Sequence, residues 1–492
     1  CVQALGKLKL NLAATRIDYA PFSGHKLYAP KGIGMLYVRA GAPFTPLMMG
    51  GGQEAGLRSG TENMAGIAAL GAVLAALEDG QTFRSHAELA AFRERLTASL
   101  EQAFPGIVFN MPFDLSLPTT LNFSVPGLSS KELLDLFDAA RVRVSSGSAC
   151  SAAKALPSYV LEAMHVPQWR ASSAIRLSFG PLIDAATIAA ACARIERCGE
   201  ALRSSCLLPS ALAPSPQDGA QDGVIQLSVD GQCTWLLSDA ASASCVVIDP
   251  VAALVPRLAA FIRCQHLALR AIVHTTAPAD HGVARLALLQ ELVIEQVGHV
   301  DIDGELALGQ QRLRRVECGE NHVYLLGQRF AFIGTLAPEA LTPLLDAALL
   351  TPDTVLCGAR DDGSICCTVR TAQEGIVPAA DLQLDAASLP AFLRQHPDAI
   401  LVDVREAYEH AACAGTVFEG CAVHSVPLSR LAGQVAAWLQ QPQCPLVFFC
   451  RSGNRSARAS ACLRRLGHAA AWQLNGGMAM AEATRHPLAI AA

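Results

Sequence analysis

The stretch Ser23–Arg39, SGHKLYAPKGIGMLYVR, joins a polar turn to an apolar run of β-forming residues. Lys26 follows His25 in that turn, and a lysine whose pKa is lowered by its surroundings can form a Schiff base with an aldehyde. Ser23 and His25 offer hydrogen-bond donors suited to a phosphate, and Gly24 lets the backbone approach closely. Taken alone, the turn is more typical of an ordinary surface lysine in a polar loop.

A second glycine-rich segment, GGGQEAGLRSGTEN at Gly50–Asn63, follows soon after. Such glycine density costs stability unless the backbone conformation is needed. Further on, Cys150 stands among small residues in VRVSSGSAC, which is typical of a mobile loop that presents a thiol. Together with VQALGK and SSAIRLSFG, these segments resemble the cysteine desulfurases of the iron–sulfur assembly type, over residues 2–180. Those are pyridoxal-phosphate enzymes with the aspartate aminotransferase fold.

The resemblance implies a role for each matched position. Those that match the cofactor site are Lys26, Gln3, Ser23, Gly24, His25 and Thr61. Lys26 matches the Schiff-base lysine, and Gln3 matches the glutamine that binds the phenolic oxygen of pyridoxal phosphate. Thr61 matches the threonine that reaches the cofactor of the neighbouring subunit, which implies a homodimer.

Two further positions match residues that act on the substrate, L-cysteine. Arg176 matches the arginine that binds the substrate carboxylate, a task for which a planar bidentate guanidinium is suited. Cys150 matches the nucleophile that becomes a persulfide. The alternatives are a surface arginine on a strand and an incidental loop cysteine.

The chain departs from the family pattern upstream of these residues. The family's aspartate on the pyridine nitrogen, its stacking histidine and most of its large domain would precede Cys1. We therefore expect residues 1–203 to contain the end of the large domain plus the small domain. We also expect that residues 1–492 alone hold pyridoxal phosphate weakly.

A second cysteine, Cys450, follows an apolar strand in FFCRSGNRSARA. We expect the loop to surround its sulfur with backbone N–H groups and the next helix to direct its positive end there. On physical grounds alone such a loop also suits a phosphatase. The flanking segments AILVDVREAYEH and NGGMAMAEA resemble those of rhodanese domains, over about 385–490.

That resemblance implies that Cys450 carries sulfur. The loop positions that match the rhodanese active loop are Arg451, Gly453 and Arg455. Asp403 and Arg405, in LVDVRE, match a signature that is structural rather than catalytic. The alternative is a rhodanese fold that serves only for docking.

Residues 224–370 resemble, more weakly, the metallo-β-lactamase-like fold with its H-x-H-x-D-H metal signature. HTTAPADH keeps Asp280 and His281, but His274 is out of register. The positions where the other ligands belong are Thr276, Pro278, Thr335 and Ala359. A metal site needs three or more ligands, so we expect a degenerate αββα domain without metal.

At 492 residues the chain is too long for one core, and its alternating helical and β-rich runs predict an α/β multidomain protein. The Pro-, Ser- and Gly-rich stretch 204–223 is interpreted as a linker, followed by domains at 224–370 and 380–492. A net charge of −5 gives no basis for binding nucleic acid or membrane. The 17 cysteines, without zinc-type or redox-type spacing, favour a reducing cytoplasm in which no disulfide is needed and most thiols are buried.

The resemblances imply an enzyme that releases alanine from L-cysteine, forms a persulfide on Cys150 and relays the sulfur to Cys450. The final acceptor is expected to be a protein such as an iron–sulfur scaffold or a thiolation enzyme. Two sulfur-handling domains on one chain raise the effective concentration of donor near acceptor. One alternative is a truncated carrier or docking protein in which only the rhodanese part works. Another, a selenocysteine lyase, is disfavoured by the SSGSAC loop.

Overall fold

The computed structural model describes residues 1–146, 158–208, 222–276, 281–298, 304–374, 382–413, 418 and 423–485. The chain divides into two compact units, Cys1–Arg197 and Cys198–Ala492. Within the described residues, no helix is long and apolar enough to cross a membrane.

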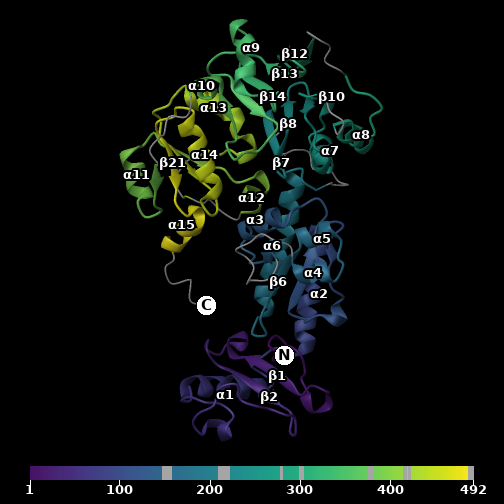
Figure 1. Ribbon diagram of the computed structural model, residues 1–492, viewed down its shortest axis with the longest axis vertical. Coiled ribbons are helices and arrows are strands. Elements are labelled where there is room, and N and C mark those ends of the chain that lie inside the picture. The colour runs from purple at the N-terminus through teal and green to yellow at the C-terminus, as the bar shows by residue number, and fades with distance from the viewer. Residues whose placement is uncertain are drawn as a thin grey trace. The chain divides into compact units, whose positions relative to one another are not determined.

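The first unit contains two antiparallel sheets (Figure 1). One is the pair β1 (Tyr19–Ser23) and β2 (Gly34–Val38); the other runs in the order β3 (Val108–Phe109), β4 (Thr120–Ser124), β6 (Ile175–Ser178) and β5 (Ser145–Ser146). The helices are α1 (Met64–Glu78), α2 (His86–Ala103), α3 (Ser130–Ala139), α4 (Tyr159–Ala163), α5 (Gln168–Ser173) and α6 (Ala185–Ser204).

Local sequence explains why these elements begin where they do. Ser85 and Glu88 form a capping box that starts α2, and Ser129 and Glu132 do the same for α3. Fully buried phenylalanines from three elements then pack ring to ring beneath the four-stranded sheet, namely Phe104, Phe123 and Phe137. The unit therefore has the mixture of helices and strands that the α/β pattern of the sequence predicts.

The second unit begins with two sheets packed face to face. The four-stranded sheet has the order β10 (Ala268–Val273), β9 (Ser244–Ile248), β8 (Gln232–Asp239) and β7 (Gly223–Val229). The six-stranded sheet has the order β11 (Glu305–Leu308), β12 (Gln311–Cys318), β13 (Asn321–Leu326), β14 (Phe330–Gly334), β15 (Val355–Gly358) and β16 (Cys367–Thr368). Helices α7 (Val255–Cys264) and α8 (His281–Leu292) belong with the first sheet; α9 (Thr342–Asp346) and α10 (Val369–Glu374) belong with the second. The expected αββα layering is therefore present.

The second unit ends in a five-stranded parallel sheet with helices around it (Figure 1). The strand order is β17 (Gln383–Leu384), β21 (Ala471–Leu474), β20 (Leu446–Phe449), β18 (Ile400–Asp403) and β19 (Val423–Ser425). The helices are α11 (Leu389–Gln395), α12 (Ala407–Ala412), α13 (Leu431–Leu439), α14 (Asn454–Arg465) and α15 (Gly477–Arg485). The strand β20 is central in the sheet and fully buried. Cys450, which follows its carboxyl end, is therefore buried in the interior rather than exposed on a surface loop.

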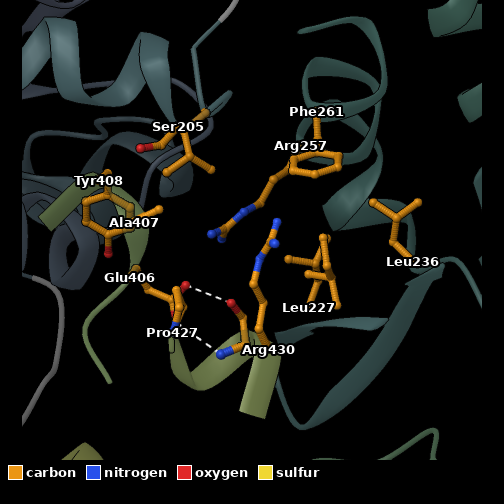
Figure 2. Close-up of a pocket in the computed structure, with 13 residues that line it drawn as sticks. Ser205, Leu227, Leu236, Arg257, Phe261, Glu406, Ala407, Tyr408, Pro427 and Arg430 are labelled. Carbon is orange, nitrogen blue, oxygen red and sulfur yellow. Dashed lines mark hydrogen bonds between the residues drawn. The ribbon is translucent and has the colours of Figure 1, made fainter. Parts of the chain in front are cut away.

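One continuous hydrophobic core joins the face-to-face sheets to the five-stranded sheet. It extends from Trp235 and Phe332 to Phe448 and Cys462, and the Sγ atoms of Cys366 and Cys462 lie 3.8 Å apart at the contact. Figure 2 shows a small cavity between residues of both parts. The second unit therefore packs as a single body, although the sequence divides it at about residue 375.

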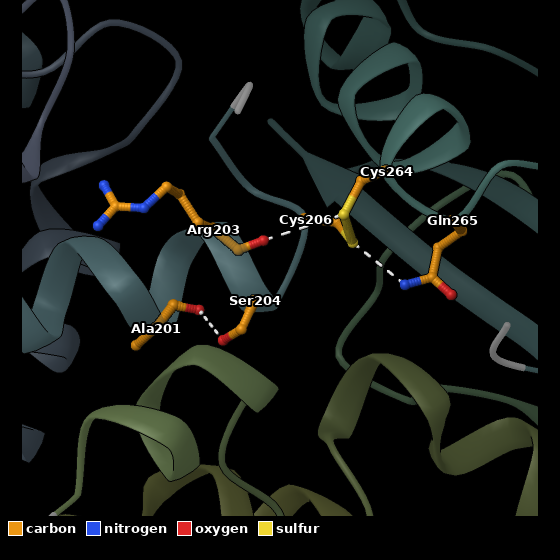
Figure 3. Close-up of a disulfide and its surroundings, with 6 residues drawn as sticks. All are labelled: Ala201, Arg203, Ser204, Cys206, Cys264 and Gln265. Carbon is orange, nitrogen blue, oxygen red and sulfur yellow. Dashed lines mark hydrogen bonds between the residues drawn. A yellow bond between two sulfur atoms is a disulfide. The ribbon is translucent and has the colours of Figure 1, made fainter. Parts of the chain in front are cut away.

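A disulfide between Cys206 and Cys264 differs from the expectation that the chain needs none (Figure 3). Cys206 follows α6, and Cys264 is the last residue of α7. The two are 58 residues apart in sequence, so spacing gives no indication of the pair. Gln265 Nε2 donates to Cys206 Sγ at 3.1 Å. Cys206 also lies within the stretch interpreted as a linker, of which 209–221 lie outside the described residues.

Candidate functional site

Cys450 lies at the junction of β20 and α14, and its side chain is fully buried. The backbone N–H of Gly453 donates to Cys450 Sγ at 3.2 Å. The hydroxyl of Ser456 lies 3.7 Å from the same sulfur and donates to the carbonyl of Gly453 at 2.9 Å. The loop and the first turn of α14 thus surround the sulfur with polar groups, of which the Gly453 N–H donates to it.

Glycines on both sides of the sulfur allow this close packing. Gly453 has φ +96°, a conformation that L side chains rarely adopt, and it caps α14. A Cβ added to Gly477 would lie 2.2 Å from the carbonyl oxygen of Cys450. The N–H of Met478 donates to that same oxygen at 2.9 Å. The sequence pattern NGGM therefore fixes the backbone of the cysteine loop from the opposite side.

Arg455 of the predicted active loop is paired with an acid that the sequence analysis did not identify. Its guanidinium makes two contacts with the carboxylate of Glu409, of which Nη2 to Oε1 is 2.7 Å. Glu409 is fully buried on α12, 46 residues away in sequence. Its only sequence signal is that it lies three residues after Glu406, with which it forms a capping box. Arg455 consequently anchors the loop, and Arg451 of the same loop is half-buried.

Asp403 and Arg405 form a buried ion pair at the end of β18. Arg405 Nη2 donates to Asp403 Oδ2 at 2.6 Å, and Arg405 Nε contacts both carboxylate oxygens at 3.0 Å. Burial acts to raise the pKa of Asp403, but hydrogen bonds from His410 and Arg405 outweigh it and hold that pKa below its ordinary value. The two side chains contact each other rather than Cys450, in keeping with a structural role.

Lys26 lies in the 3₁₀ turn η2 (Gly24–Leu27) that connects β1 to β2. Lys26 and His25 are exposed, and Ser23 Oγ is hydrogen-bonded to His25 Nδ1 at 3.0 Å. Lys7 lies near enough to this turn to be repelled by Lys26, and its Nζ donates to Gln3 Oε1 at 2.9 Å. Burial and then repulsion from Lys26 lower the pKa of Lys7. A hydroxyl, an imidazole and two ammonium groups therefore gather around the turn.

Arg176 stands on β6 of the other sheet in the same unit. The hydroxyl of Tyr28, the residue after η2, lies 2.0 Å from where a Cβ on Gly180 would be, and Gly180 is two residues beyond the end of β6. Arg176 Nε is buried without a hydrogen-bond partner among the described residues. The turn supplies a hydroxyl, an imidazole and an ammonium group, which suit a phosphate-bearing aldehyde, and Arg176 supplies a guanidinium on a strand of the other sheet, which suits a carboxylate. Lys26 is exposed, so the described residues do not enclose its side chain.

Of two other predicted residues, one lies in the glycine-rich loop and one lies outside the described residues. Thr61 is exposed in the glycine-rich loop, where Arg58 Nη1 donates to the carbonyl of Gly60 at 2.9 Å. Cys150 lies outside the described residues, which end at 146 and resume at 158.

The degenerate metal motif lies at the end of β10. Thr275 donates to Asp249 through its backbone N–H at 2.8 Å and through its hydroxyl at 2.7 Å. Thr335, at a position where a ligand is expected in the family, is exposed after β14, while Pro278 and Asp280 lie outside the described residues. In the part of the chain that the structure describes, no group of three or more His, Cys, Asp or Glu side chains could hold a metal ion.

Comparison with known proteins finds a matching family for the N-terminal region and another for the C-terminal region of the chain. Residues 1–190 match the Aminotransferase class-V family, and residues 386–482 match the Rhodanese-like domain. The cysteine desulfurase of Gluconacetobacter diazotrophicus is 43% identical over 178 residues, which cover 36% of this chain and 44% of that protein. The chain thus spans less than half the length of this curated relative.

Solved structures give neighbours for two regions. A NifS-like protein from Rickettsia africae is 30% identical, with a TM-score of 0.33, covering 39% of this chain and 50% of that one. A metallo-β-lactamase from Staphylococcus aureus is 13% identical, with a TM-score of 0.26, covering 52% and 99%. The chain is a multidomain α/β protein that carries a class-V aminotransferase region homologous to cysteine desulfurases at its N-terminus and a rhodanese domain at its C-terminus.

Proposed function

We propose that the protein is a sulfur-mobilising enzyme that takes sulfur from L-cysteine on Cys150 and transfers it to Cys450. The observation that carries the proposal is the pairing, on one chain, of a region 43% identical to a cysteine desulfurase with a rhodanese domain. Desulfurase and carrier on one chain keep the sulfur at high effective concentration near its acceptor. The domain limits 1–203, 224–370 and 380–492 belong to the same proposal.

The first half-reaction uses the residues around Lys26. Lys26 would hold pyridoxal phosphate, with the hydroxyl of Ser23 and the ring of His25 on its phosphate. Bound there, the cofactor supplies an electron sink for cleavage of a carbon–sulfur bond. Arg176 would bind the carboxylate of L-cysteine through its guanidinium, and Thr61 would reach the site of a second subunit in a homodimer.

Neither of the two sulfur-transfer steps requires an oxidant. The thiolate of Cys150 forms a bond to the sulfur of L-cysteine, the carbon–sulfur bond breaks, and the carbon takes up a proton to give alanine. The thiolate of Cys450 then forms a bond to the outer sulfur of the Cys150 persulfide, and the Cys150 thiolate leaves. The N–H of Gly453, 3.2 Å from Cys450 Sγ, is placed to stabilise the charge that the sulfur carries. The sulfur on Cys450 would then pass to a protein acceptor, such as an iron–sulfur scaffold or a thiolation enzyme in the cytoplasm.

The experiment that tests this division of labour measures alanine and sulfide formed from L-cysteine with dithiothreitol and added pyridoxal phosphate. We expect Cys150→Ser to abolish both products. Cys450→Ser should leave alanine formation largely intact. When the sulfur of the L-cysteine is radioactive, the variant should carry no label on the peptide that contains residue 450. Equal loss of alanine in both variants would contradict the proposal.

A second function is favoured by the contrast between a buried Cys450 and an exposed Lys26. Under this alternative the rhodanese domain works alone as a sulfur carrier. Wild type and Cys150→Ser would then transfer sulfur from thiosulfate at equal rates, and neither would form alanine from L-cysteine.

A further inference from the structure

Two cysteines of the second unit that neither candidate sulfur site uses lie in contact with each other. Cys366 belongs to the loop 359–366 between β15 and β16, and Cys462 lies on α14, 96 positions further along the chain. Their Sγ atoms are 3.8 Å apart, and Cys462 Sγ also lies 3.7 Å from the carbonyl oxygen of Cys366. The contact therefore joins the six-stranded sheet to the helix that follows the Cys450 loop.

Both thiols are enclosed in the hydrophobic core of the unit. The side chain of Cys462 is 0% exposed and that of Cys366 is 4% exposed. A single buried cysteine ordinarily acts as a small hydrophobic side chain. Here each sulfur has another sulfur as its neighbour, and an approach of about 1.8 Å would bring the two to the length of a disulfide bond.

Two contacts hold the loop 359–366 against α14. Arg458 Nη2 donates to Asp361 Oδ1 at 2.9 Å, and Arg465 Nη2 donates to the carbonyl oxygen of Ser364. The two arginines lie on either side of Cys462 along the helix. The helix and the loop therefore keep the two thiols facing each other.

The two sulfurs differ in how readily they lose a proton. A hydrogen bond from the thiol of Cys366 lowers the pKa of Cys462; burial opposes this change, and the charge of Arg465 adds to it. The same hydrogen bond, together with burial, raises the pKa of Cys366 well above its ordinary value. Cys462 is thus the nucleophile of the pair, and Cys366 holds the proton.

We propose that Cys366 and Cys462 form a reversible disulfide when hydrogen peroxide oxidises them. The thiolate of Cys462 attacks one oxygen of the peroxide, which gives a sulfenic acid on Cys462 and a hydroxide ion. The sulfur of Cys366 then attacks the sulfur of Cys462, and the departing hydroxide takes the Cys366 proton and leaves as water. The pair gives up two electrons, which the peroxide receives.

The enclosure of the pair decides which class of oxidant can act on it. Hydrogen peroxide is uncharged and close to water in size, whereas glutathione disulfide is a charged peptide whose exchange with a thiol requires access to the sulfur. Burial of both sulfurs therefore favours the peroxide. The neighbouring Cys367 is only half-buried, so a bulky oxidant reaches it more easily than it reaches Cys366.

The test exposes the full chain, reduced beforehand, to hydrogen peroxide and, in a separate arm, to glutathione disulfide. Remaining thiols are alkylated, and tryptic peptides are analysed by mass spectrometry without reduction. Trypsin releases Cys366 in the peptide 361–370 and Cys462 in the peptide 459–464. We expect peroxide to link these two peptides about tenfold faster than glutathione disulfide does, and dithiothreitol to separate them.

The adjacent cysteine provides the matched control, because the peptide 361–370 contains both Cys366 and Cys367. Cys366→Ser should abolish the link to the peptide 459–464. Cys367→Ser should keep it, since the sulfur of Cys366 is the one that lies 3.8 Å from Cys462 Sγ. Circular dichroism first shows that each variant is folded. If Cys366→Ser does not fold, fragmentation of the linked wild-type peptides identifies which of the two cysteines carries the bond.

Three results would overturn the proposal. The first is that peroxide leaves the peptides 361–370 and 459–464 unlinked while it oxidises other thiols of the chain. The second is a link that survives in Cys366→Ser or that fragmentation assigns to Cys367. The third is an equal rate of linking by peroxide and by glutathione disulfide, which would show that burial does not select the oxidant.

Discussion

The two regions proposed to handle sulfur differ in how completely they are enclosed. Cys450 is 0% exposed, and a loop, a helix and a glycine turn of the same unit surround it. Lys26 and His25 are exposed on a short turn beside a two-stranded sheet. The loop around Cys450 is therefore enclosed by the parallel sheet and helices of its own unit, whereas the described residues leave the side chains of Lys26 and His25 uncovered.

The physical reason lies in the architecture behind each residue. A parallel sheet covered on both faces gathers its loops at the carboxyl ends of the strands, so the loop that contains Cys450 is buried from the start. A two-stranded sheet has little buried area of its own, and the side chains of His25 and Lys26 in its connecting turn remain exposed. Disrupting the supports of each site should therefore have effects of very different size.

The largest effect is expected from Asp403→Ala, which leaves Arg405 buried without its partner. Losing one member of a buried pair costs about 3–5 kcal/mol of unfolding free energy. Pulse proteolysis in urea, with peptides around residue 403 read by mass spectrometry, measures the change. Asp353→Ala is the control, since its pair with Arg370 is exposed and should contribute little to stability. Similar losses in both variants would contradict the structural role of the buried pair.

The next effect concerns the loop itself. Gly453→Ala should lower the unfolding free energy by about 1–3 kcal/mol, because alanine is strained at φ +96°. It should also slow sulfur transfer, since the N–H that contacts Cys450 Sγ would shift. Gly467→Ala is a matched control with φ +98° and no atom within 4 Å of the added Cβ. It should lose similar stability without any change in sulfur transfer; equal slowing in both variants would argue against a role for the Gly453 N–H.

These expectations rest on features that the sequence shows to different degrees. Periodicity predicts α14 and β20 because their apolar residues fall on regular faces. It misses β12, where QRLRRVEC places arginines on a strand with a single buried residue, Leu313. The contact of Glu409 with Arg455 and the disulfide at Cys206 could not be predicted, since each joins residues brought together only by the tertiary fold. Local pattern therefore indicates the loop around Cys450 but not the acid that anchors it.

Lys26→Ala should have almost no effect on stability, because substitutions of exposed side chains stay within about 0.5 kcal/mol. It should abolish the visible absorption that wild type gains when pyridoxal phosphate is added in excess. Lys31→Ala, in the same connection and also exposed, should keep that absorption. We expect wild type purified without added cofactor to show only a weak band. A strong band there would mean that residues 1–492 hold the cofactor well.

The smallest effect is expected from Lys7→Gln, and it should depend on pH. Burial and Lys26 lower the pKa of Lys7 below its ordinary 10.5, so above the lowered pKa the unfolded chain binds more protons than the folded one. Stability of wild type should therefore rise with pH in the window between the lowered pKa and 10.5. Lys7→Gln removes the penalty, so its gain, about 0.5 kcal/mol or less at pH 7, should shrink as pH rises through that window. Pulse proteolysis of peptides from residues 1–30 measures it, with Lys31→Gln as the control; a gain that does not change with pH would show that the ammonium of Lys7 is not strained by its surroundings.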